Sequence, residues 1–72
     1  MSDIWSDEYK NFLMRLKQAR KEAGLTQVQV AEKINQHQSF VAKCENGERR
    51  VDVIELTKLA KIYNKSISFF VE

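Results

Sequence analysis

The sequence predicts an all-α protein, a compact bundle of five helices joined by very short connections. Apolar residues recur every three or four positions, and no stretch alternates Val or Thr with polar residues as a half-buried strand would. The 72 residues also include no proline and only two glycines, so little interrupts the helices. At this length and with 43% apolar residues, we expect a single domain over residues 1–72 with one small core.

The first helix is expected to begin after Ser6, a favourable N-cap, and to end where Gly24 adopts a left-handed conformation. Spacings of four, three and four residues predict its buried stripe, which comprises Phe12, Leu16, Ala19 and Ala23. Before the cap, Ile4 and Trp5 are expected to fold back on the domain. An exposed contact is the alternative for Trp5.

The second and third helices are predicted from their caps and from one tight turn. Thr26 is the expected N-cap of the second helix, and Asn35 suits a left-handed turn after it. His37 stands at the cap position of the third helix, which the Asn46-Gly47 pair ends. The inward face of the second helix is predicted to comprise Val30, Ala31 and Ile34.

The fourth and fifth helices follow the same logic. Asp52 is the expected cap of the fourth helix, a turn follows at Asn64, and Ser66 is the expected cap of a last helix over residues 67–71. The buried stripe of the fourth helix is predicted to comprise Val53, Leu56, Leu59, Ala60 and Tyr63.

The third helix has an unusual outward face. A rotation of 100° per residue directs Val41 and Cys44 to the core, with Phe40 and Glu45 on the flanks. A merely solvated face would carry several long charged residues, whereas here only one side chain is charged and the others are short or bear amides. Glutamine suits adenine, lysine suits guanine or a phosphate, and small residues let a helix enter the DNA major groove. The outward face is predicted to comprise Gln38, Ser39, Ala42, Lys43 and Asn46.

The charge distribution favours a polyanionic partner. The formal net charge is +2, but residues 11–50 hold eight bases and four acids. The positive field therefore surrounds the third helix, although ordinary solvated charge is an alternative explanation.

These motifs resemble a known family. The stretch G-L-T-Q-V-Q-V-A-E-K-I-N-Q-H-Q-S-F-V-A-K-C-E-N-G-E-R-R is similar to the helix-turn-helix of the Cro and phage-repressor (lambda-repressor-like, XRE-type) family, with the motif at about residues 26–46. The resemblance extends over roughly residues 12–71. Small prophage regulators and restriction–modification controller proteins are examples of this family with a similarly minimal build. It implies a cytoplasmic, nucleoid-associated transcription regulator, such as a repressor, that binds double-stranded DNA as a homodimer on a (pseudo)palindromic operator.

The resemblance also implies roles for single residues. Gln38, Ser39 and Lys43 would read bases, and Ala42 would touch a thymine methyl group. Arg20 and Glu45 would form an ion pair that orients the third helix. The residues expected at the DNA backbone are Gln27, Asn46, Arg49 and Arg50, with His37 as either a poor cap or a further phosphate contact. The chain departs from the family where Asn35 replaces the usual Gly, His37 a Ser or Thr, and Ala42 a common Ser.

An apolar surface for self-association is expected on the last two helices. Ile67 and Phe70 are predicted to face the core. The alternative is that the C-terminal tail folds under the small core. The residues expected outside the buried faces, and hence at a dimer interface, are Ile54, Ile62, Phe69 and Val71.

Other classes of function fit less well. His37 and Cys44 are seven positions apart, about 10.5 Å along a helix, which is too far for a nucleophile and its base. One His and one Cys do not complete a zinc site, and no Gly-rich phosphate loop is present. We therefore expect no catalysis, cofactor, metal or small-molecule ligand. No apolar run approaches 18 residues, so no membrane segment is expected, and a single cysteine suits a reducing cytosol.

A DNA-binding antitoxin, or a protein-interaction adaptor of the same fold, is the alternative within this fold. The chain lacks an extended tail that would wrap a toxin, which argues against the antitoxin. A toxin gene beside this one would favour it.

Overall fold

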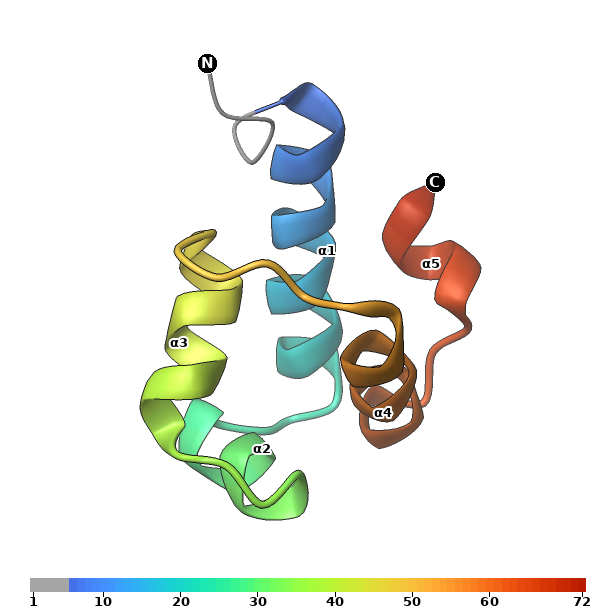
Figure 1. The fold of residues 1–72 in the computed structure, drawn as a ribbon. Coiled ribbons are helices and arrows are strands. Elements are labelled where there is room, and N and C mark those ends of the chain that lie inside the picture. The colour runs from blue at the N-terminus through green and yellow to red at the C-terminus, as the bar shows by residue number, and fades with distance from the viewer. Residues whose placement is uncertain (1–5) are drawn as a thin grey trace.

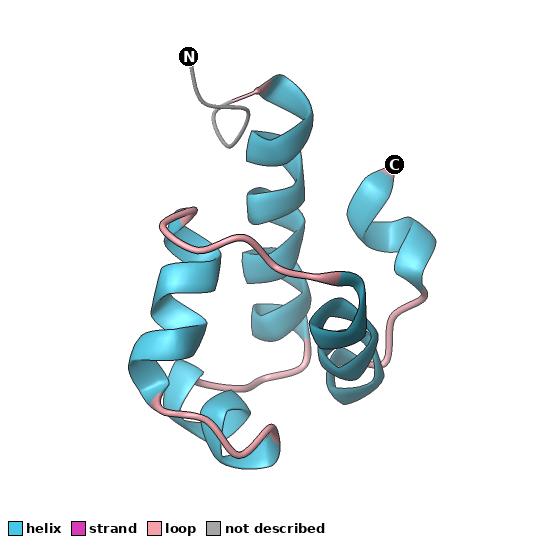
Figure 2. Cartoon of the chain, in the orientation of Figure 1, coloured by secondary structure: helices cyan, strands magenta, loops and turns pink. Residues whose placement is uncertain are grey.

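The computed structural model describes residues 6–72, which fold into five helices (Figure 1). All regular structure in this part of the chain is helical (Figure 2), which confirms the predicted all-α fold. The helix of residues 7–22 lies at the centre, with the helix of residues 38–46 on one side and those of residues 53–63 and 67–71 on the other (Figure 1). The helix of residues 27–33 lies below its lower end in this view. Ile4 and Trp5 lie outside the described residues. The helices are α1 (Asp7–Glu22), α2 (Gln27–Lys33), α3 (Gln38–Asn46), α4 (Val53–Tyr63) and α5 (Ile67–Val71).

Helix α1 begins and ends where the sequence predicts. The Ser6 hydroxyl accepts a hydrogen bond from the Tyr9 N–H, and Gly24 has a φ of 73°. The predicted stripe is wrong at its end, because Ala23 is the C-cap residue, just after the last turn of the helix, and is exposed. Leu13, which the predicted stripe omitted, is buried, and Phe12 is only partly buried.

The turns around α2 and α3 also follow the predicted chemistry. Thr26 and Gln29 form a reciprocal capping box at the start of α2. Asn35 has a φ of 58° and Gly47 a φ of 79°, so both turns use the left-handed region. His37 occupies the N-cap of α3, but its side chain makes no capping hydrogen bond.

Helix α4 starts with a second capping box, between Asp52 and Glu55. Four of its five predicted core residues are buried, namely Leu56, Leu59, Ala60 and Tyr63. The prediction for Val53 is wrong, since its side chain is 69% exposed. Val53 lies at the margin of the stripe and in the first turn, where the helix borders an open groove.

Helix α5 follows a left-handed turn at Asn64 and contributes one fully buried side chain, Phe70. Ser66 occupies the N-cap but bonds to the Ser68 hydroxyl rather than capping the backbone. The prediction that Ile67 faces the core is wrong, because it is 40% exposed beside the same groove as Val53. A helix of five residues has one inward position per turn, and Phe70 fills it. No helix in residues 6–72 has both the length and the apolar character needed to cross a bilayer.

Candidate nucleic-acid interface

The outward face of α3 combines short and amide-bearing side chains. Val41 and Cys44 are buried on the opposite face, where burial raises the pKa of the Cys44 thiol and keeps it neutral. Ala42, expected on the outward face, is half-buried. The structure therefore presents a narrow polar ridge, whose exposed residues are Gln38, Ser39, Lys43 and Asn46.

A buried ion pair anchors α3 to α1. Arg20 Nε lies 2.6 Å from Glu45 Oε2, and Arg20 Nη2 donates to Glu45 Oε1 at 3.1 Å. Arg20 Nη1 also donates to the Leu25 carbonyl at 3.0 Å. Glu45 was expected on a flank but is only 3% exposed, because these partners cover it. The hydrogen bond to Glu45 raises the pKa of Arg20, so the guanidinium stays charged, and the two-pronged contact fixes the rotation of α3.

Gln27 links the ion pair to Gln38 on the exposed face of α3. Its Nε2 donates to Glu45 Oε1 at 3.0 Å, and its Oε1 accepts from Gln38 Nε2 at 2.7 Å. Gln38 is therefore held from behind at the leading end of the ridge. Its own amide oxygen accepts no hydrogen bond within residues 6–72, and the residue is exposed.

The two arginines after α3 have different environments. Arg49 forms a two-pronged contact with Glu55, at 2.7 Å for each pair of atoms, and its guanidinium lies 4.6 Å from the centre of the Phe40 ring. Arg50 is exposed and lies 4.9 Å from the centre of the Tyr9 ring. Arg49, predicted at the DNA backbone together with Arg50, is thus engaged within the protein.

Sequence reasoning missed Glu55 and Phe40 as partners of Arg49. The Asp52-x-x-Glu55 spacing does predict a capping box, which places the Glu55 carboxylate in the first turn of α4 beside the end of the connector. The ring of Phe40 was assigned to a flank of α3, and nothing in the local pattern indicates that an arginine covers it.

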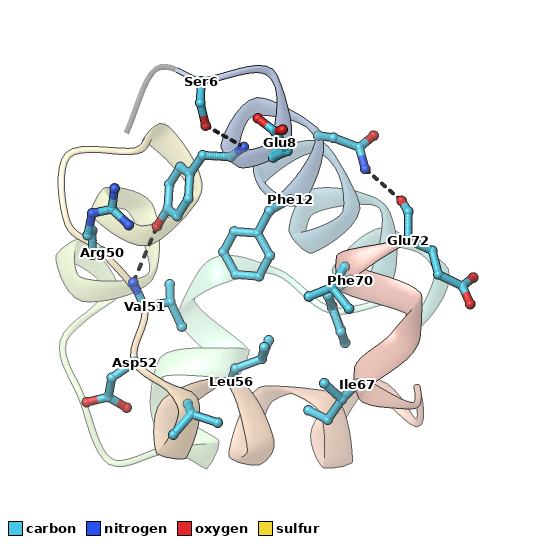
Figure 3. Close-up of a pocket in the computed structure, with 14 residues that line it drawn as sticks. Ser6, Glu8, Phe12, Arg50, Val51, Asp52, Leu56, Ile67, Phe70 and Glu72 are labelled. Carbon is cyan, nitrogen blue, oxygen red and sulfur yellow. Dashed lines mark hydrogen bonds between the residues drawn. The ribbon is translucent and has the colours of Figure 1, made fainter. Parts of the chain in front are cut away.

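A groove of about 720 Å³ lies between the start of α1 and helices α4 and α5 (Figure 3). Phe12, Leu56 and Phe70 are among the apolar side chains that line it, and the Val51 N–H donates to the Tyr9 hydroxyl at one end. This groove belongs to the side of the molecule that carries α4 and α5, whereas α3 lies on the other side of α1 (Figure 1).

The surface expected for self-association is only partly exposed. Ile54 and Val71 are 63% and 65% exposed, but Ile62 and Phe69 are half-buried against the core. Phe69 is covered because Arg15 and Lys65 both lie over its ring, 5.0 Å and 4.6 Å from its centre. The exposed apolar residues of α4 and α5 are instead Val53, Ile54, Ile67 and Val71.

Helix α2 packs behind α3, and α3 carries the polar ridge on its outward face. This arrangement defines a helix-turn-helix DNA-binding domain. The helix-turn-helix family model matches residues 16–70, and the chain belongs to this family, in the Cro-like (XRE) group of DNA-binding transcription regulators. The chain is also 40% identical over 55 residues to the HTH-type transcriptional regulator ImmR of Bacillus subtilis (strain 168). That match covers 76% of this chain and 43% of ImmR, so the chain spans less than half of that relative's length.

Proposed function

We propose that this chain regulates transcription by placing α3 in the major groove of a specific operator. The observation that carries the proposal is the ridge of Gln38, Ser39 and Lys43, exposed on a helix whose other face is locked by a buried ion pair. A reading helix must be held rigidly, since base discrimination depends on side-chain geometry at the base edges. A regulator of this kind would work on the nucleoid, in the cytoplasm.

The exposed side chains divide into base readers and backbone contacts. Gln38 pairs with adenine through its amide, Lys43 reaches guanine, and Ser39 contacts either kind of base. Ala42, at the margin of the ridge, meets a thymine methyl group. The backbone contacts are Gln27, which also holds Gln38, together with Asn46 and Arg50.

His37 is a further backbone contact in this proposal. Its side chain is exposed at the N-terminus of α3 and makes no capping hydrogen bond. The imidazole can therefore contact a phosphate oxygen of the DNA. A His37→Ala variant should then bind operator and unrelated DNA more weakly by about the same factor, because a phosphate contact carries no sequence information. Unchanged DNA binding by this variant would remove His37 from the contacts.

The chain acts as a homodimer in this proposal. Val53, Ile54, Ile67 and Val71 form an exposed apolar surface that a second copy would cover. A two-fold dimer brings the same surface of both copies together and places two α3 helices about 34 Å apart, one turn of DNA. Such a dimer reads a palindrome or near-palindrome.

Selection of bound duplexes from a random pool, at a stated salt concentration, tests the proposal directly. We expect one enriched motif with two related half-sites whose centres are about 10 bp apart. A variant that carries Gln38→Ala and Lys43→Ala, both on the exposed face, is the matched control and should enrich no such motif. A wild-type pool without any enriched sequence would contradict the proposed function.

A further inference from the structure

Arg49 connects the two halves of the domain. Its Nη1 and Nη2 each donate to a different oxygen of Glu55 at 2.7 Å, and Nη1 also donates to the Arg50 carbonyl at 2.9 Å. Its guanidinium lies against the ring of Phe40 on α3. One side chain therefore joins α3, the connector after it and the first turn of α4.

Glu55 is itself held in place by the capping box of α4. It accepts a hydrogen bond from the Asp52 N–H at 3.1 Å, and its own N–H donates to Asp52 Oδ1 at 2.8 Å. The carboxylate that receives Arg49 is thus a fixed point at the start of a helix rather than a mobile surface group. The Glu55 side chain is 23% exposed and that of Arg49 is 41% exposed, so only the carboxylate is partly shielded from water.

This arrangement is a poor one for a phosphate contact by Arg49. The Glu55 oxygens lie 2.7 Å from the guanidinium nitrogens, so a DNA phosphate that approached Arg49 would also approach the Glu55 carboxylate. The negative phosphate and the negative carboxylate would then repel each other. Arg50 has no such obstacle, because it is exposed over the Tyr9 ring and has no carboxylate partner within residues 6–72.

We infer that Arg49 is a positioning residue for DNA binding, which holds residues 47–51 through Glu55 and Phe40 so that Arg50 meets the DNA backbone. This inference rests on the proposed function. It also revises the expectation from the sequence, in which both arginines contact phosphates. The first arginine sets the geometry of the connector, and the second supplies the charge that DNA receives.

The substitution Glu55→Gln separates the two roles by the sign of its effect. If Arg49 positions the connector, loss of the carboxylate loosens it, and affinity for the selected operator falls by roughly 3- to 10-fold. If Arg49 instead contacts a phosphate, removal of the competing carboxylate frees the guanidinium and strengthens binding. The amide oxygen of the new side chain can still accept the Asp52 N–H bond, so the cap of α4 is retained. Unchanged or tighter binding by Glu55→Gln would overturn the inference.

The salt dependence of binding gives a second readout, which a loss of stability alone does not change. Each phosphate contact adds about 0.9 to the slope of log affinity against log salt. Arg50→Ala should lower the slope by about one phosphate's share, and Arg49→Ala added to it should lower the slope no further, because Arg49 acts through Arg50. A slope that is lower for the double variant than for Arg50→Ala would show that Arg49 has its own phosphate contact and would overturn the inference.

Arg49→Lys decides the question if the alanine variant does not fold. Lysine keeps the charge but forms neither the two-pronged contact nor the flat stack on Phe40. The inference predicts weakened binding for Arg49→Lys, whereas a phosphate contact predicts affinity near that of the wild type. If the wild-type chain selects no duplex, the proposed function fails. If it selects one and Arg49→Lys binds like wild type, only this inference fails.

Discussion

At the scale of single residues, Lys43 is the only charged side chain on the exposed ridge of α3. Lys43→Ala should cost roughly 1–3 kcal/mol on the selected operator and relax the base preference at one position of each half-site, because it removes a contact to a base edge. Titration of the operator and of its single-base variants at fixed salt measures both effects. A uniform loss on all duplexes would instead place Lys43 at the backbone.

Arg50 provides the comparison, since its expected role is at the phosphates. Arg50→Ala should weaken binding to operator and unrelated DNA by about the same factor, because a phosphate contact carries no sequence information. The same duplex titrations, extended to a shuffled sequence, measure the ratio. A loss confined to the operator would show that Arg50 reads bases and would contradict this assignment.

At the scale of elements, a series of side-chain hydrogen bonds links α1, α3 and α2, and it runs through Arg20, Glu45, Gln27 and Gln38. Arg20→Ala should lower the free energy of unfolding by about 3 kcal/mol, because it leaves the buried Glu45 carboxylate without its cation. Denaturant unfolding measures the change. Lys17→Ala, an exposed position on the same helix, is the control and should stay within about 0.5 kcal/mol of the wild type. Equal effects of the two substitutions would contradict a stabilising role for the pair.

The carboxylates of Glu55 and Glu22 connect different segments of the fold, and they should make the free energy of unfolding depend on pH in the acid range. Hydrogen bonds from Arg49 hold the pKa of Glu55 below its ordinary value of 4.5, and a contact with Lys65 does the same for Glu22. A lowered pKa in the folded state favours the ionised form. That stabilisation is complete above about pH 4.5 and is lost as the pH falls through the lowered values.

Thermal melts between about pH 7 and about pH 2.5 check this expectation. The wild-type melting temperature should fall below the ordinary glutamate value, and the Glu22→Gln, Glu55→Gln double variant should start lower at neutral pH and fall less. Parallel curves for the two proteins would show that other groups control the acid response.

The sequence predicted those features of the elements that depend on a few neighbouring residues. The caps at Ser6, Thr26 and Asp52 and the left-handed turn at Asn35 follow from local backbone chemistry, and each is present. The exposed ridge of α3 followed from helical rotation alone. The roles of its residues at DNA stay predictions, although the family itself is established by the match over residues 16–70.

The features that the sequence did not predict depend on distant contacts. Val53 and Ile67 were assigned to the core because periodicity cannot tell where a neighbouring helix ends. Phe69 was assigned to the surface because its covering cations come from other segments, Arg15 on α1 and Lys65 before α5. The pairing of Arg49 with Glu55 likewise depends on the path of the connector.

At the scale of the whole molecule, α3 lies on one side of α1 and helices α4 and α5 lie on the other (Figure 1). Helix α3 carries the polar ridge, and α4 and α5 carry the exposed apolar residues. Self-association through α4 and α5 therefore leaves both copies of α3 free for DNA. Binding of two half-sites by one dimer should then be cooperative, because the second contact is made without a new loss of translational freedom.

Ile54→Glu with Val71→Glu should separate the proposed dimer into monomers, because each substitution puts a charge on the exposed apolar surface that the proposed dimer would bury. Sedimentation at micromolar concentration should find a dimer for the wild type and a monomer for the variant. The variant should bind the full operator far more weakly but bind an isolated half-site like the wild type, because α3 is untouched. Lys61→Glu, an exposed change on the same helix, controls for added negative charge. A wild-type monomer at that concentration, or equal operator affinity for both proteins, would contradict this surface as the dimer interface.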